Sequence, residues 1–228
     1  MTRKTLDERL QALLDNVVAL GSMVEEALIK SVDALKRRDF EASRRIIEAD
    51  KEINHKRYEI EEETLVLLAT QQPMATDLRI LASVIEIATE LERIGDYAKG
   101  IASINLKIGE EPLMKPLIDL PRMAELAAQM LHTALESFVN KDVETAYRVI
   151  RQDDEVDALY EQVYRELMTL IMQNPHHIEQ ANYLLWAAHN LERSADRVTN
   201  ICERTIFVVT GQLMDLDAYE AADDIDVA

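Results

Sequence analysis

The 228-residue sequence contains little of what interrupts a regular chain: it has five glycines and five prolines. Aromatic residues make up 5% of it, and Cys202 is its single cysteine. A β-sandwich or a doubly wound sheet would need more turn residues and more β-branched runs, which argues against both fold classes. One cysteine excludes an internal disulfide and a cysteine-based metal site, so we expect Cys202 to be a small core residue. The scarcity of helix breakers predicts an all-α fold.

The sequence is also short of positive charge and of long apolar runs. It has 25 Lys and Arg against 43 Asp and Glu, which gives a formal net charge of −18 at pH 7. Such a surface repels phosphate backbones, so we expect no nucleic-acid binding, and it suits cations or partners with basic patches. No apolar run is long enough for a membrane span, and residues 1–8 contain no apolar leader. We therefore expect a cytoplasmic protein without direct membrane insertion, held at the inner membrane through partners.

Apolar residues recur at helical spacing along the chain. From Leu6 to Leu35 they alternate steps of three and four, and Asp39 then has the position of a helix N-cap. A second helix should follow Asp39, and a third should run from about residue 76 to 107 and end at Gly109. In the second half we expect helices at about 121–140, 142–173 and 178–210. The pattern thus predicts six long helices, three in each half.

The second half of the chain repeats the first. With an offset of 103 residues Asp39 corresponds to Asp142, and the stripe at 46, 53, 60 and 67 corresponds to the one at 149, 156, 163 and 170. A segment with several prolines, 111–121, separates a first unit, 1–110, from a second, 122–212, and an acidic tail that we expect to be disordered follows at 213–228. We predict two tandem three-helix bundles, since long helices joined by short turns pack antiparallel.

Each half carries two pairs of oxygen-bearing side chains with a spacing of four residues, all acidic except for Asn54, and this spacing places both members of a pair on one helix face. If the second and third helices of a bundle are neighbours, three or four oxygen atoms could face one another. Like charges about 4 Å apart repel by roughly 4 kcal/mol at an effective dielectric of 20, and a bound cation would turn that repulsion into coordination. All-oxygen sites prefer Fe(III), Mn(II), Mg(II) or Ca(II). The candidate metal ligands are Asp50, Asn54, Glu92, Asp96, Asp153, Asp157, Glu192 and Asp196.

Other interpretations of these residues stay open. The acids could pair with the neighbouring Arg93, Arg193 and Arg197 and hold no ion. His189, three residues before Glu192, is either an extra ligand or a partly buried histidine. Asn54 is neutral where its counterpart is Asp157, so the first site should be the weaker one. Trp186, on a helix rich in Ala and Leu, is expected in the core.

At Glu92-Arg93-Ile94-Gly95-Asp96 and Glu192-Arg193-Ser194-Ala195-Asp196 the chain resembles the PhoU family of phosphate-uptake regulators. The resemblance covers nearly the whole chain and implies two three-helix bundles, each with a multinuclear metal cluster, of iron or zinc, on the eight candidate ligands. It further implies a homodimeric adaptor without catalysis. Its partners would be the ATPase subunit of a phosphate ABC transporter and a membrane sensor histidine kinase, through which it represses phosphate-starvation genes.

Two other classes of function remain as alternatives. The carboxylates could belong to a metal-dependent enzyme or a metal-storage protein, which would need an open coordination position inside a cavity. The chain could also be a purely structural helical scaffold. The sequence contains no glycine-rich phosphate loop, no G-x-S-x-G and no Cys/His dyad, which favours the regulator.

Overall fold

The computed structural model describes residues 3–213, and every regular element in that range is a helix. The predicted all-α class is confirmed, whereas the predicted acidic tail falls almost entirely outside the described residues. The helices are α1 (Arg3–Arg37), α2 (Phe40–Gln71), α3 (Thr76–Ile108), α4 (Asp119–Asn140), α5 (Val143–Ile150), α6 (Asp153–Gln173), the 3₁₀ turn η1 (Pro175–His177) and α7 (Ile178–Thr210).

The turn between the first and second helices is built in the same way in both units. Asp39 caps α2, and its carboxylate accepts a hydrogen bond of 2.8 Å from the backbone N–H three residues later. Asp142 caps α5 with the equivalent bond of 3.1 Å. The residue before each cap has a left-handed backbone, with φ of 58° at Arg38 and 56° at Lys141. The N-cap predicted at Asp39 is confirmed, and the local chemistry of the turn repeats along with the sequence.

The helix predicted at 142–173 is in fact interrupted. Residues 151 and 152 form a turn in which the N–H of Gln152 bonds to the carbonyl of Val149, three residues back, at 3.0 Å. The interruption makes Asp153, Asp154 and Glu155 the first turn of α6. Unpaired N–H groups and the helix dipole favour acids at that end of a helix, which gives a physical reason for a new start here. In the first unit α2 runs on through the corresponding residues.

The connection between the units is shorter than predicted, and its central residues are hydrogen-bonded to α7. Helix α4 begins at Asp119, so Pro121 lies in its first turn, where a proline costs no helical hydrogen bond. The side chain of Gln180 accepts a hydrogen bond from the N–H of Met114 and donates one of 3.0 Å to the carbonyl of Pro112. The connection is therefore tied to the start of α7.

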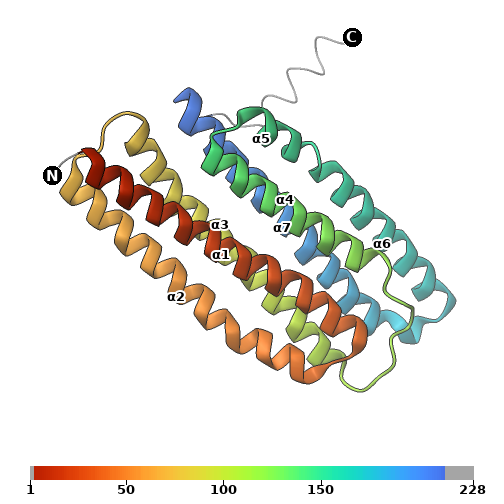
Figure 1. Ribbon diagram of the computed structural model, residues 1–228. Helices are drawn as coiled ribbons and strands as arrows, with labels where there is room; N and C mark the ends of the chain where they lie inside the picture. The colour runs from red at the N-terminus through yellow and green to blue at the C-terminus, as the bar shows by residue number, and fades with distance from the viewer. Residues whose placement is uncertain (1–2, 214–228) are drawn as a thin grey trace, which may run out of the picture.

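Figure 1 shows the helices side by side in an elongated molecule, with α2 and α6 at opposite edges. Helices α1 and α3 of the first unit lie next to α4 and α7 of the second. One cluster of buried apolar side chains extends across both units. Polar links add to it: Arg197 lies 3.3 Å from Glu90, and Arg193 donates a 3.1 Å hydrogen bond to the hydroxyl of Tyr97. The two bundles are thus joined through a continuous core.

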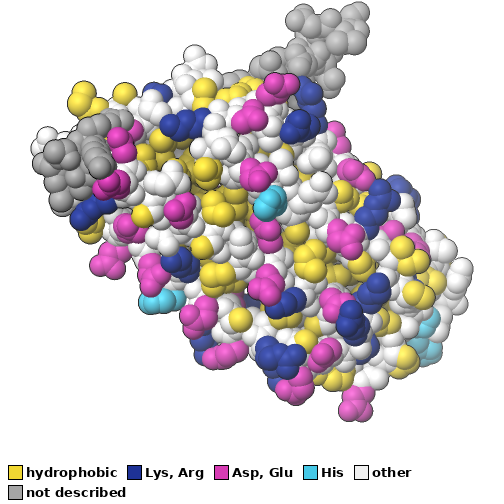
Figure 2. Space-filling view, viewed as in Figure 1, with side chains coloured by type: hydrophobic (Ala, Val, Ile, Leu, Met, Phe, Trp, Pro, Cys, Tyr) yellow, Lys and Arg dark blue, Asp and Glu magenta, His cyan; other side chains and the backbone are white. Residues whose placement is uncertain are grey.

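The surface carries the charge that the composition predicts, but not as one patch. On the face with α1 and α4 in front, acidic side chains are interspersed with basic ones (Figure 2). Cys202 is fully buried, as expected. Trp186 is 56% exposed, so its predicted place in the core is wrong: it lies on the outer side of α7, away from the apolar stripe. Among residues 3–213, no helix is long and apolar enough to cross a membrane.

Candidate functional site

The structure places the eight candidate ligands on pairs of neighbouring helices. In the first unit they lie on α2 and α3, and in the second on α6 and α7. We call these groups the first cluster and the second cluster. The first cluster comprises Asp50, Asn54, Glu92 and Asp96, and the second comprises Asp153, Asp157, Glu192 and Asp196. Since α2 and α6 form opposite edges of the molecule, the two clusters are separate (Figure 1).

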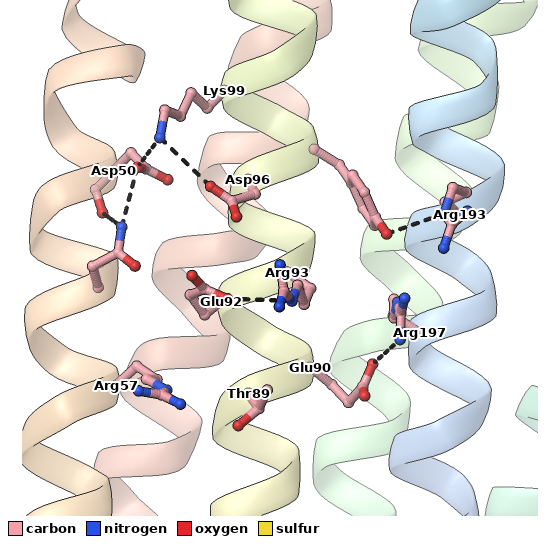
Figure 3. Close-up of polar contacts among 12 residues, drawn as sticks. Asp50, Arg57, Thr89, Glu90, Glu92, Arg93, Asp96, Lys99, Arg193 and Arg197 are labelled. Carbon is pink, nitrogen blue, oxygen red and sulfur yellow. Dashed lines mark hydrogen bonds and ion pairs between the residues drawn. The ribbon is translucent and has the colours of Figure 1, made fainter.

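An ammonium group occupies the first cluster. Lys99 Nζ lies 2.7 Å from Asp50 Oδ2 and 3.5 Å from Asp96 Oδ1, so it bridges α2 and α3 (Figure 3). The Asp50 side chain is only 5% exposed, and Asn54 Nδ2 donates a further hydrogen bond of 3.1 Å to the same Oδ2. The hydrogen bond to Asp50 raises the pKa of the Lys99 ammonium, which keeps it charged at neutral pH. Asn54 therefore presents its amide N–H, rather than its oxygen, to Asp50.

The remaining acid of the first cluster is also near positive charge. Glu92 Oε2 lies 3.8 Å from Arg93 Nε, as the ion-pair interpretation predicted for this arginine. Burial and the neighbouring Asp96 raise the pKa of the Glu92 carboxyl, while Arg93 and Arg57 act to lower it. Figure 3 shows Arg57 on α2, facing the same inter-helical space as Glu92. The first cluster is thus compensated by residues of its own unit.

The second cluster has weaker compensation: His189 and Arg193 act to lower the pKa of Glu192. Burial, followed by the charges of Asp196, Asp157 and Glu192, raises the pKa of the Asp153 carboxyl to about 7. Burial and Asp196 also raise the pKa of Asp157 and of Glu192. Among the described residues, no Lys or Arg forms an ion pair with Asp153, Asp157 or Glu192. The acids of the second cluster instead raise one another's pKa values, as four carboxylates sharing a site must do.

Two buried oxygen atoms of the second cluster accept no hydrogen bond, Asp153 Oδ1 and Glu192 Oε2, against one in the first cluster, Asp50 Oδ1. His189 Nδ1 lies 3.1 Å from Glu192 Oε2, so it is a charge partner when protonated, but it is not aligned as a hydrogen-bond donor. The imidazole ring also lies near the rings of Tyr160 and Trp186, with centroid distances of 6.1 and 6.4 Å. A buried acceptor without a donor is costly, and a bound cation would satisfy it.

The arginines near the second cluster point elsewhere. Arg193 bonds to Tyr97 and lies over its ring, 5.8 Å from the centroid, and Arg197 pairs with Glu90. Both contacts cross from α7 to α3, as Figure 3 shows. Arg193 acts to lower the pKa of Glu192, but neither arginine forms an ion pair with Glu192 among the described residues. They contribute instead to the contact between the units.

The fit to a metal differs between the clusters. Within residues 3–213 no three His, Cys, Asp or Glu side chains meet in a geometry that could hold a metal ion. The donor chemistry of the second cluster nevertheless suits a hard cation, because it offers carboxylates only and two of their buried oxygens lack donors. The first cluster does not fit, since the Lys99 ammonium lies where a cation would bind.

Sequence reasoning missed Lys99, the residue that distinguishes the clusters. A signal was available: Lys99 is three residues after Asp96, and a lysine at that spacing reaches a carboxylate on the same helix face. What the spacing could not show is its bond to Asp50 on another helix. The corresponding residue in the second unit, 100 positions later, is Thr199.

Comparisons with known proteins agree with the repeat. The model of the PhoU domain matches twice, at residues 17–104 and 120–205. The chain is 33% identical over 218 residues to the phosphate-specific transport system accessory protein PhoU homolog of Clostridium acetobutylicum, covering 95% of this chain and 100% of that protein. It is 34% identical over 203 residues to the phosphate-specific transport system accessory protein PhoU of Escherichia coli K12, covering 89% and 84%. The crystal structure of the phosphate transport system regulatory protein PhoU from Streptococcus pneumoniae superposes with a TM-score of 0.85 at 32% identity, covering 92% of this chain and 99% of that one.

Proposed function

The chain belongs to the PhoU family, and on that premise we propose that it is a non-enzymatic regulator of phosphate uptake that represses the response to phosphate starvation. The observation that carries this proposal is the match over nearly the whole chain to proteins named as accessory or regulatory proteins of phosphate transport. Both units and their packing are shared with such a protein, so the relationship is not limited to one module.

In this role the protein is a cytoplasmic adaptor that works as a homodimer. It contacts the ATPase subunit of a phosphate ABC transporter on one side and a membrane sensor histidine kinase on the other. The net charge of −18 supports binding to partners with basic faces, because complementary charge accelerates encounter and selects partners. The long parallel and antiparallel helices offer extended faces for such contacts (Figure 1).

Deleting the gene tests the regulatory role. We expect phosphate-starvation genes to be expressed in phosphate-rich medium and phosphate uptake to rise, with both restored by a plasmid copy. Unchanged reporter expression and uptake in the deletion strain would contradict the proposal. Loss of an enzyme could also change the phosphate concentration in the cell. The deletion strain should therefore be compared with a strain that lacks the transporter.

A pulldown from solubilised membranes tests the adaptor role. Purified protein should capture the transporter ATPase subunit and the histidine kinase. The matched control is an unrelated helical protein of similar negative charge, which separates specific capture from ionic attraction. Capture of neither partner, or equal capture by the control, would sink the adaptor proposal. Light scattering of the same sample measures whether the protein is the proposed dimer.

We further propose that the second cluster binds metal, as the buried oxygens without donors at Asp153 and Glu192 favour. Bridging carboxylates could hold more than one ion: iron or zinc as the family implies, or Mn, Mg or Ca by oxygen chemistry. Elemental analysis of untagged protein purified without chelator measures the content. Replacing Glu192 and Asp196 together by Ala should abolish it, whereas the matched change at Glu92 and Asp96 should preserve it. Trace metal in the unchanged protein would contradict the proposal.

The alternative of a carboxylate enzyme or a metal store makes a different prediction from the same sample. A store would bind many ions per chain, and an enzyme would keep an open coordination position for substrate. A small fixed number of ions, all with saturated coordination by X-ray absorption spectroscopy, would favour the regulator over both alternatives.

A further inference from the structure

We propose that the first unit carries its own cation: the ammonium of Lys99 takes the place that a metal ion would fill between α2 and α3, so that the first cluster is metal-independent and only the second needs an external ion. The statement about Lys99 stands on the geometry of the first unit alone. The statement about the second cluster rests on the metal binding proposed above.

The Lys99 side chain is 39% exposed, but its ammonium reaches a buried carboxylate, which an ordinary surface lysine does not. Its Nζ is 2.7 Å from an Asp50 oxygen and 3.5 Å from an Asp96 oxygen, on two different helices. Asp50 is 95% buried, so its charge needs a permanent partner. A typical surface pair in this chain, Lys30 and Glu26, leaves both side chains more than 60% exposed and stays on one helix.

The packing around Lys99 closes the space further. A methyl group on Gly95 would lie 3.1 Å from a side-chain carbon of Ile53, so the missing side chain lets α2 and α3 approach closely at this level. The second unit has Ala195 at the corresponding position. Asn54 adds a donor to Asp50 from the α2 side. A metal ion could enter the first cluster only by displacing the ammonium and turning the amide.

The two units differ in charge at corresponding positions around the clusters. At three positions around the clusters, the second unit is one charge more negative than the first. These exchanges are Lys99 against Thr199, Asn54 against Asp157, and Arg57 against Tyr160. At two of these positions the first unit has a positive side chain where the second has a neutral one, while the acids Asp50 and Asp153 are present in both. The reverse exchange, Tyr97 against Arg197, supplies a charge that pairs with Glu90.

Exchanging the residues between the units tests the inference. Lys99→Thr, in chelator-treated protein, should lower Tm by about 2–4 °C more than Lys30→Thr, which carries the same change of helix propensity at an exposed site. Circular dichroism confirms that each variant is folded. If Lys99→Thr unfolds like Lys30→Thr, the ammonium does not act as the internal cation and the inference is overturned.

Mn²⁺ binding supplies the second measurement, in the background where Glu192 and Asp196 are Ala and only the first cluster remains. With Lys99 present this protein should bind no Mn²⁺, and adding Lys99→Thr with Asn54→Asp should create a site. Stoichiometric Mn²⁺ with Lys99 in place would overturn the inference. In the otherwise unchanged chain, Thr199→Lys should weaken Mn²⁺ binding at least about tenfold.

The two proposals fail in different ways. If the unchanged protein binds no Mn²⁺ but Lys99→Thr still loses stability, the metal proposal for the second cluster is wrong and the role of Lys99 stands. If the second cluster binds Mn²⁺ and Lys99→Thr has no effect beyond its control, the reverse holds.

Discussion

The two units keep the same acids on corresponding helices and treat them differently. In the first, Lys99 forms an ion pair with Asp50, and Asn54 donates a further hydrogen bond to the same oxygen. In the second, Asp153 faces only further carboxylates, and their mutual repulsion together with burial raises its pKa to about 7. A repeated motif therefore does not imply a repeated function. The residues around the acids decide whether the acids form an ion pair with a lysine or remain a group of carboxylates that a cation could bind.

The backbone differs at the same place. Helix α2 is continuous through Asp50, whereas α5 ends and α6 begins just before Asp153. The new start exposes N–H groups next to three successive acids, which offsets part of their repulsion. The second unit thus places its excess negative charge at a helix start, where the first unit has a lysine side chain.

Removing metal should separate the units most strongly. With Mn²⁺ at 100 times its Kd, binding stabilises a protein by about 2.7 kcal/mol, so chelator should lower Tm of the unchanged chain by several degrees. The same chelator should leave the Glu192→Ala, Asp196→Ala protein unaffected. Replacing Glu92 and Asp96 instead should preserve the full shift. Differential scanning calorimetry with and without chelator measures all three proteins. If the unchanged chain has the same Tm with and without chelator, the proposed difference between the units in metal binding is wrong.

The matched changes Asp50→Asn and Asp153→Asn should have opposite effects on metal-free protein. The first leaves Lys99 without its buried partner and should lower the free energy of unfolding by roughly 1–2 kcal/mol. The second removes a carboxylate held among like charges and should raise it at pH 8 by on the order of 1–2 kcal/mol, allowing for solvent screening. Urea unfolding of both variants checks the signs. Destabilisation by both would mean that the second cluster is compensated in a way that its contacts do not show.

The pH dependence of metal-free protein should sharpen the same contrast. The folded pKa of Asp153, about 7, lies above its ordinary value of 3.8, so the native state binds the extra proton. Its stabilising contribution is therefore present at low pH and is lost as pH rises from about 4 through 7. Asp153→Asn should flatten this part of the profile, whereas a change at the exposed Glu144, which is not among the charges that raise the pKa of Asp153, should leave the slope in place. Parallel profiles for Asp153→Asn and the unchanged chain would contradict the raised pKa.

The smallest effect concerns Trp186, which stands where the first unit has Glu86. Because the indole is 56% exposed, Trp186→Glu should change the free energy of unfolding by no more than about 0.5 kcal/mol. Leu191→Ala, on the buried side of the same helix, should cost about 2–5 kcal/mol. Chemical unfolding of the pair measures the difference, and a large loss for Trp186→Glu would show that the tryptophan is covered.

Much of the fold could be predicted because its signals are local. The apolar stripe that includes Ile46 and Ile53 repeats every seven residues. The stripe and the N-cap at Asp39 each depend on residues within one or two turns of a helix. The predicted helix 178–210 agrees with α7. The interruption at residues 151–152 was missed, since helix-forming residues continue through it and three acids only bias where a helix starts.

The sequence predicted where the acids of the candidate site lie, but not which partners they have. The spacing of four in Glu92-x-x-x-Asp96 and its copy placed the acids on α3 and α7. It could not tell that Arg193 and Arg197 turn to Tyr97 and Glu90 of the other unit. The alternatives of ion pair and metal site were undecided in the sequence, because both use the same residues.

By itself, the sequence determined the helices, the repeat and the faces on which the acids lie, since helical period and capping act within a few residues along the chain. Only the tertiary structure decided the partners. Lys99 and Asp50 are 49 residues apart, and Arg197 and Glu90 are 107 apart, so each contact depends on how two helices are aligned along their length. That alignment is set by the packing of the apolar core shared by both units, where a shift by one turn, about 5.4 Å, would bring different charges together.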